Sequence, residues 1–206
     1  MTFKTEQEIF WAGEFGDEYI ARNKSQEYLA SNLNFFSRIF NRVSKPASLI
    51  EFGANIGMNL KAIQLLFPGI NLFGIEINQK AAEELAVAVG TDNVFSGSIF
   101  DFEPSKQFEV SLIKGVLIHI NPEHLPQVYE KLYEASSKYI LICEYYNPSP
   151  VTITYRGHND RLFKRDFAGE MLEKYSDLKL YDYGFCYKRD RAFPQDDVTW
   201  FLLEKA

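Results

Sequence analysis

The sequence has little cysteine and no long uncharged apolar run, and each absence excludes a class of protein. Its 206 residues include only Cys143 and Cys186, whose positions suit neither a disulfide framework nor a metal-ligand pattern. We predict that both are small buried hydrophobes and that the chain has no metal site. No stretch is long and apolar enough to predict a membrane span.

Basic residues are also in deficit, because the formal net charge is −6 at pH 7. A protein dominated by nucleic-acid binding would normally carry a basic surface, so no nucleic-acid partner is expected. The N-terminus lacks a basic start followed by an apolar core, so we predict no signal peptide and a cytoplasmic location. The length favours one domain, and we find no internal repeat, low-complexity tract or linker.

A short apolar run followed by a glycine turn organises the chain. Residues 48–52 suit a strand buried on both faces, and Gly53 and Gly57 allow positive φ where helical spacing begins. A dinucleotide fingerprint needs glycine at the first, third and sixth positions of this turn, where the chain has Gly53, Asn55 and Met58. An NAD site is therefore disfavoured, although a ligand is still expected at the turn.

An acidic residue follows at the spacing typical of a nucleotide-type βαβ unit. Glu76 lies 19 residues beyond Gly57, near the end of a strand predicted over residues 70–77. A carboxylate in this position accepts hydrogen bonds from ribose hydroxyls. We assign Glu76 and the adjacent Ile77 to cofactor binding.

Strands and helices alternate along most of the chain, which predicts a doubly wound parallel α/β sheet with ligands at the carboxyl ends of its strands. Further strands are predicted over residues 93–97, 108–114 and 139–145. The C-terminal region changes to two β-rich runs, residues 178–187 and 198–204, joined by a polar loop, which indicates a hairpin. Five polar or charged residues fall at or near strand ends: Glu51, Glu76, Ser98, Lys114 and Tyr145.

The turn and its preceding acid resemble motif I of the class I S-adenosylmethionine (SAM) methyltransferases. Glu51 precedes the turn, Gly53 and Gly57 are the first and fifth positions, and Asn55 replaces a common glycine with a residue that tolerates the left-handed region. The resemblance implies SAM as cofactor and a single Rossmann-like domain, with a mostly parallel seven-stranded sheet, an antiparallel C-terminal hairpin and helices on both faces. It places Glu51 toward the cationic methionine end of SAM.

The same resemblance assigns the region after the third strand to adenine. Ser98 stands where this superfamily commonly has Asp, and its hydroxyl could pair with the adenine amine while Ile99 or Phe100 packs on the ring. Asp101 is an alternative source of the acid. Lys114 lies beside the expected methyl-donor site.

A basic segment after the fifth strand indicates the substrate half. In an acidic chain, Arg156, Arg161, Lys164 and Arg165 gather in a short region with His158. Guanidinium groups bind carboxylate or phosphate in bidentate fashion, so an anionic substrate is expected. A solvated loop with internally paired charges is the alternative. Arg156, His158, Arg161, Arg165 and the nearby Tyr145 are our candidate substrate contacts.

Blocks spread over nearly the whole chain narrow the resemblance to the pseudaminic acid biosynthesis-associated methylase family. They are Phe10-Trp11, residues 15–20, 144–148, 155–158, 165–170, 182–185, 195–197 and 199–201. The resemblance implies methylation linked to bacterial nonulosonic acids, which are nine-carbon acidic sugars. Their carboxylate agrees with the basic segment.

Methyl transfer from a sulfonium is an in-line displacement, so the protein mainly aligns the acceptor. A neutral acceptor nitrogen needs a proton acceptor nearby, and His158 and His119 are the candidates, with Tyr145 and Glu144 orienting them. For each histidine a structural role is the alternative.

The first 45 residues are predicted to be a helical segment of the same domain, and residues 46–206 the methyltransferase domain. Because Phe10, Trp11, Phe15 and Tyr19 are costly to expose together, this segment either covers the ligand as a lid or extends the core. Two other functions stay open: methylation of another small molecule or a protein, and SAM binding by a regulator without chemistry.

Overall fold

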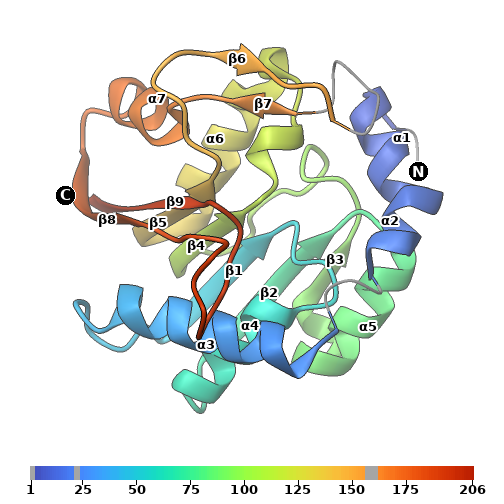
Figure 1. Cartoon of the computed structure of the whole chain (residues 1–206), viewed down its shortest axis with the longest axis horizontal. Coiled ribbons are helices and arrows are strands. Elements are labelled where there is room, and N and C mark those ends of the chain that lie inside the picture. Colours follow the sequence, from blue (N-terminus) through green and yellow to red (C-terminus); the bar gives the residue numbers. More distant parts are fainter. Residues whose placement is uncertain (1–2, 21–23, 156–161) are drawn as a thin grey trace.

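A seven-stranded mixed sheet forms the centre of the molecule in the computed structural model, which describes residues 3–20, 24–155 and 162–206. The strand order is β3-β2-β1-β4-β5-β9-β8 (Figure 1). The first five strands in the chain are β1 (Ser48–Phe52), β2 (Asn71–Glu76), β3 (Val94–Ser96), β4 (Phe108–Lys114) and β5 (Ser136–Glu144). They pair in parallel, and the final pair, β8 (Leu178–Phe185) and β9 (Thr199–Lys205), is antiparallel.

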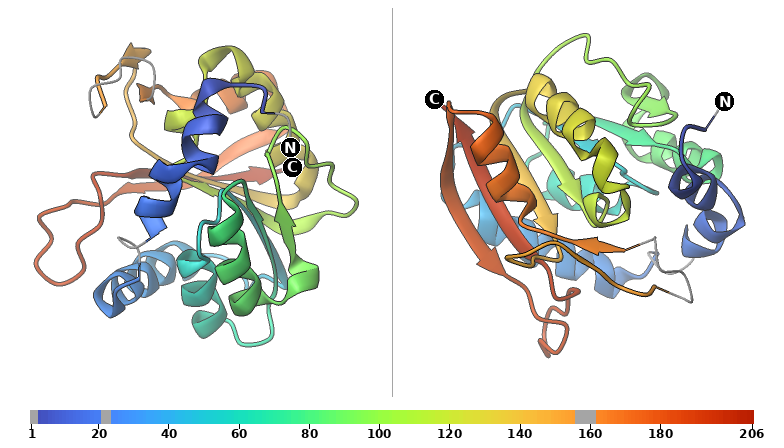
Figure 2. Two further views of the ribbon diagram at one scale, coloured as in Figure 1. Left: turned by 90° about the vertical axis from the view of Figure 1, so that its right-hand side faces the viewer. Right: turned by 90° about the horizontal axis from the view of Figure 1, so that it is seen from above.

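Helices cover both faces of this sheet (Figure 2). One face packs against α3 (Gln26–Phe40), α4 (Met58–Leu66) and α5 (Gln79–Val89), and the other against α6 (Leu125–Ala135) and α7 (Phe167–Lys174). A hydrophobic core lies on each face of the sheet. Leu49 of β1 packs in one core, and the next residue, Ile50, packs in the other. Strands buried on both faces explain why the parallel region reads as apolar runs rather than alternation.

Helix starts follow the capping residues that the sequence supplies. Ser25 caps α3 by accepting a hydrogen bond from the amide of Tyr28, and Asn78 caps α5 through the amide of Ala81. Pro122 opens a 3₁₀ turn, η4 (Pro122–His124), that leads into α6, with Asn121 as its cap. The 3₁₀ turn η2 (Thr91–Asn93) lies directly before β3, and a further 3₁₀ turn, η3 (Leu117–His119), follows β4.

Two short helices, α1 (Glu6–Ala12) and α2 (Glu14–Ile20), precede the sheet and lie beside α5. A small second sheet pairs β6 (Val151–Thr152) with β7 (Phe163–Lys164). The predicted fold class is confirmed, including the seven strands and the antiparallel hairpin. The division at residue 45 stays a prediction. In the described ranges, none of the helices combines the length and apolar character needed to cross a membrane.

Candidate functional site

The turn between β1 and α4 adopts backbone conformations that its glycines permit. Gly53 has φ +74° and Gly57 has φ +77°, and Asn55, at +49°, is also in the left-handed region. A Cβ added to Gly53 would meet Cγ2 of Val116 at 2.5 Å, so the turn also passes close to the loop after β4. The turn therefore exposes backbone at the carboxyl edge of the sheet, as predicted.

Glu76 at the end of β2 fastens this turn. Its Oε2 accepts a hydrogen bond from the amide of Asn55 at 2.7 Å, and its Oε1 accepts one from the amide of Asn78 at 2.8 Å. Burial raises the pKa of this carboxyl, and the backbone hydrogen bonds oppose the rise. Glu76 thus presents an oriented carboxylate at the sheet edge.

Glu51 lies deeper, behind the turn. Its side chain is fully buried, and its Oε1 accepts a hydrogen bond from Nδ2 of Asn59 at 2.6 Å. Burial raises the pKa of Glu51 to about 8, against the opposing effects of Asn59 and Lys114. Within the part of the chain that the structure describes, Glu51 Oε2 and Asn59 Oδ1 are buried without a hydrogen-bond partner, and Asn59 borders a cavity. Such orphaned acceptors indicate a place for a ligand donor or cation.

Lys114 extends from the end of β4 toward α3. Its Nζ lies 3.4 Å from the hydroxyl of Tyr28 and within 6 Å of the ring centres of Tyr28 and Phe35. Burial lowers the pKa of this ammonium, but Tyr28, Cys143 and Glu51 together raise it above its ordinary value. Lys114 is therefore a positive charge held near the buried Glu51.

A cavity of about 650 Å³ lies against these groups. Its lining comes from the glycine turn, the ends of β2, β4 and β5, the first two helices and the loop between β8 and β9. This volume is within the usual range for small-molecule sites. The cavity lies at the carboxyl ends of the parallel strands, where open α/β sheets bind ligands.

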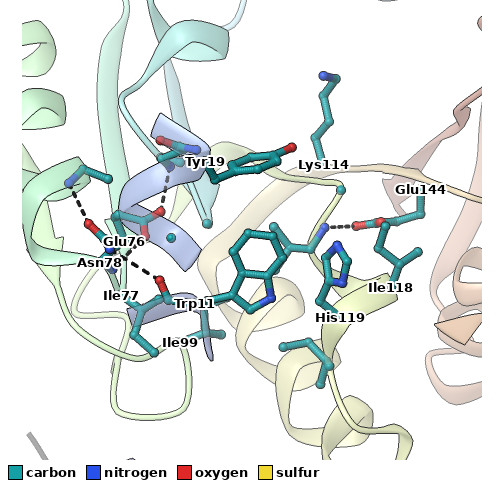
Figure 3. Close-up of a pocket in the computed structure, with 18 of the residues that line it drawn as sticks. Trp11, Tyr19, Glu76, Ile77, Asn78, Ile99, Lys114, Ile118, His119 and Glu144 are labelled. Carbon is teal, nitrogen blue, oxygen red and sulfur yellow. Dashed lines mark hydrogen bonds between the residues drawn. The ribbon is translucent and has the colours of Figure 1, made fainter. Parts of the chain in front are cut away.

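Aromatic side chains of α1 and α2 border one side of the cavity (Figure 3). The Trp11 ring lies 4.7 Å from the ring of His119 and 5.4 Å from that of Tyr19. Asp17 attaches α2 to the start of α5, because its carboxylate pairs with Lys80 and accepts a hydrogen bond from Nδ2 of Asn78 at 2.9 Å. The N-terminal segment therefore contributes to the cavity wall.

The end of β5 supplies a third buried carboxyl, Glu144. Its Oε1 accepts hydrogen bonds from the amides of Val116 and Leu117, both at 2.9 Å, whereas its Oε2 has no partner. Burial raises the pKa of Glu144 to about 7, and the backbone amides oppose that rise. Burial, followed by the nearby Asp196 carboxylate, also raises the pKa of the neighbouring Tyr145.

A buried amide pair positions the loop between β8 and β9. Nε2 of Gln195 donates to Oδ1 of Asn32 on α3 at 2.8 Å, and both side chains are buried. This bond holds Pro194 and Asp196 at the cavity. The loop joins the site although it lies 163 residues from its partner in the chain.

Most residues predicted to bind a cofactor line the cavity. These are Gly53, Asn55, Glu76, Ile77, Ser98, Ile99 and Lys114, together with the catalytic candidates His119 and Tyr145. Glu51 and Gly57 support the turn from behind. Each assigned role stays a prediction.

Most of the basic segment cannot be compared with the site. Arg156, His158 and Arg161 lie outside the described residues. Arg165 is absent from the cavity lining, and its Nε donates to Oε1 of Glu170 at 2.6 Å. Its contact with the substrate stays a prediction. Asp101, the alternative adenine acid, pairs with Lys4 and also lies away from the lining.

Sequence reasoning gave no role in the site to the polar lining residues Glu8, Asn59, Gln195 and Asp196, although residues 195–197 are one of the blocks that carry the family resemblance. The spacing of Glu8 and Trp11, three residues apart on one helix face, was a usable signal for α1. The contribution of the β8–β9 loop depends on tertiary pairing that no local pattern reveals. Within the described ranges, no group of three or more His, Cys, Asp or Glu residues could hold a metal ion.

No protein-family profile and no curated protein match the sequence. Solved structures do resemble its fold. Magnesium protoporphyrin IX methyltransferase (ChlM) from Synechocystis PCC 6803, with bound S-adenosylhomocysteine (SAH), has a TM-score of 0.74 and 11% identity, covering 99% of this chain and 100% of its own.

Two further structures show the same arrangement. The mitomycin 7-O-methyltransferase MmcR has a TM-score of 0.69 and 16% identity over 98% of this chain, which spans only 61% of MmcR. The glycopeptide N-methyltransferase MtfA, complexed with SAM, has a TM-score of 0.62 and 14% identity over 85% of this chain and 93% of its own. The chain therefore has the fold of the class I SAM-dependent methyltransferases.

Proposed function

We propose that this protein is a SAM-dependent methyltransferase. The observation that carries the proposal is the Glu76 carboxylate, which the backbone amides of Asn55 in the glycine turn and Asn78 at the start of α5 orient at the edge of a cavity of suitable size. A carboxylate at the end of the second strand suits the two ribose hydroxyls of SAM. The fold shared with methyltransferases supports the same conclusion.

Other polar side chains suit the two charged groups of the methionine portion of SAM. The orphaned Oδ1 of Asn59, backed by Glu51, suits the ammonium of the methionine portion, and Lys114 suits its carboxylate. Ile77 and Ile99 offer apolar surface for adenine. An unsatisfied buried acceptor is costly, so a ligand donor at Asn59 would contribute to affinity.

When bound, SAM supplies a methyl group on a positively charged sulfur. The residues of this chain then have three tasks. The aromatic wall from Trp11 and Tyr19 excludes water, the turn fixes the donor, and the groups at the end of β5 align the acceptor. His119 and Tyr145 line the cavity and are our candidates for contact with an acceptor, and His158 is our other candidate base.

For the acceptor we propose an amino- or amidino-bearing nonulosonic acid of the pseudaminic or legionaminic type, or its precursor, in bacterial surface glycan synthesis. Support comes from the sequence blocks described above and from the mixed charge of the cavity lining. Asp196 and Glu144 suit a nitrogen group, and Lys188, also in the lining, suits a sugar carboxylate.

The test is mass spectrometry of the purified protein incubated with SAM and a panel of nonulosonic acids. The panel contains free and nucleotide-linked sugars that carry amino, amidino or acetamido groups. One added methyl on one member, with SAH formed in equal amount, is the expected result. SAH formed only with cell extract would move the acceptor to another small molecule or a protein. Binding of SAM without any turnover would favour a regulator.

A further inference from the structure

The end of β3 has no carboxylate directed at the cavity. Ser98 stands there, and its Oγ accepts the amide hydrogen of Phe100 at 3.0 Å. Asp101 pairs with Lys4 at 2.7 Å, is 47% exposed and lies outside the lining. The exocyclic amine of an adenine bound beside Ile77 and Ile99 carries two hydrogens, and buried donors need acceptors. The strand does not supply a charged acceptor for them.

Helix α1 brings a carboxylate to the same side of the cavity. Glu8 is only 6% exposed and lines the cavity together with Trp11, which follows it by three residues on the same helix face. Its Oε2 accepts hydrogen bonds from the amides of Lys4 at 2.6 Å and Thr5 at 2.9 Å. Its Oε1 is buried and has no hydrogen-bond partner among the described residues. One oxygen is therefore held by backbone amides and the other is unpaired in this part of the chain.

Lys4 connects this carboxylate to the loop after β3. Its backbone amide donates to Glu8, and its Nζ pairs with Asp101, so one lysine side chain spans the gap between them. Trp11, labelled in Figure 3 with Ile77, Ile99 and His119, contacts the ring of His119, and Glu8 lines the same cavity as the two isoleucines suited to adenine.

We propose that Glu8 accepts a hydrogen bond from the exocyclic amine of adenine, so that the N-terminal helix supplies the carboxylate that the end of β3 lacks. This inference rests on the proposed function, because it requires that the cavity bind SAM or SAH. It also gives the N-terminal segment a role in recognition as well as in enclosure.

The experiment compares SAH with S-inosyl-L-homocysteine, in which the amine is replaced by a carbonyl oxygen, by titration calorimetry. Because hydrogen bonds to charged groups contribute about 1.5–3 kcal/mol, wild-type protein should bind SAH at least about 10-fold more tightly. In Glu8→Gln the amide can donate to the carbonyl, so the affinity ratio should fall by about 10-fold or more. Glutamine also suits the capping box at this position, which preserves α1.

Glu6→Gln is the matched control, since it removes one negative charge from the same turn at an exposed position outside the cavity lining. Its affinity ratio should equal that of the wild type. Glu8→Ala provides a second variant, in which the ratio should also fall. An unchanged ratio in both Glu8 variants, or an equal change in Glu6→Gln, would overturn the inference. Absence of SAH binding by the wild type would overturn the proposed function itself.

Discussion

The fully buried Glu51 makes the stability of the protein depend on pH in a predictable direction. Burial raises its pKa from the ordinary value of 4.5 to about 8, because the charged form loses hydration that Asn59 and Lys114 only partly replace. The folded protein therefore binds this proton more tightly than the unfolded chain does. The resulting stabilisation is present below pH 4.5 and is lost as the pH rises toward 8.

The magnitude follows from the two pKa values. Between pH 6 and pH 8.5, linkage predicts that Glu51 lowers the free energy of unfolding by about 2–3 kcal/mol. Glu51→Gln removes the titration, so the variant should lose that much less stability over the same interval. Glu76 and Glu144, whose pKa values are also raised, are present in both proteins and cancel in the comparison.

Urea denaturation of both proteins at the two pH values measures this difference. Glu173→Gln, on the exposed side of α7, is the matched control and should follow the wild type. At pH 8.5, where Glu51 is ionised, the Glu51→Gln variant should bind SAH about 10- to 100-fold more weakly, because the ammonium loses the charge that backs Asn59. Parallel stability curves for wild type and Glu51→Gln would refute the reasoning about this buried carboxyl.

Three further predictions test the site. Glu76→Ala should lower the free energy of unfolding by about 2–5 kcal/mol, because two backbone amides lose their hydrogen-bond acceptor. The same variant should show no measurable SAH binding in calorimetry. Glu144→Ala should lower the free energy of unfolding by about 2–4 kcal/mol for the same reason. Glu144→Gln keeps an acceptor for the two amides, so urea denaturation should show a smaller loss of stability. Gly53→Ala should cost about 2–4 kcal/mol, more than Gly115→Ala, because only the first adds a clash to the left-handed strain; equal costs would contradict this account.

Much of the fold follows from local pattern. The predicted strands over residues 48–52 and 108–114 coincide with β1 and β4, because apolar runs bounded by turn residues identify buried parallel strands. The hairpin of β8 and β9 also follows from its two β-rich runs. The observed third strand, β3, covers only Val94–Ser96 and is shorter than the predicted range of residues 93–97. It pairs with β2 alone, because it lies at the edge of the sheet.

The sequence predicts the site only where the residues that meet in space belong to one short motif, such as the βαβ unit. Glu76 and the turn illustrate this, because the spacing of one motif determines their contact. Glu8, Gln195 and Asp196 reach the cavity through packing of distant segments, such as the pair Gln195–Asn32. The ion pair of Arg165 with Glu170 on α7 is likewise a tertiary contact that the local sequence pattern does not indicate.

The most direct test of the central claim is a crystal structure of the protein with SAH. The account predicts SAH in the cavity beside the glycine turn, with the ribose hydroxyls within hydrogen-bond distance of Glu76 and the methionine ammonium beside Asn59. The cavity remaining empty at saturating SAH, or SAH bound with its ribose away from Glu76, would contradict the account.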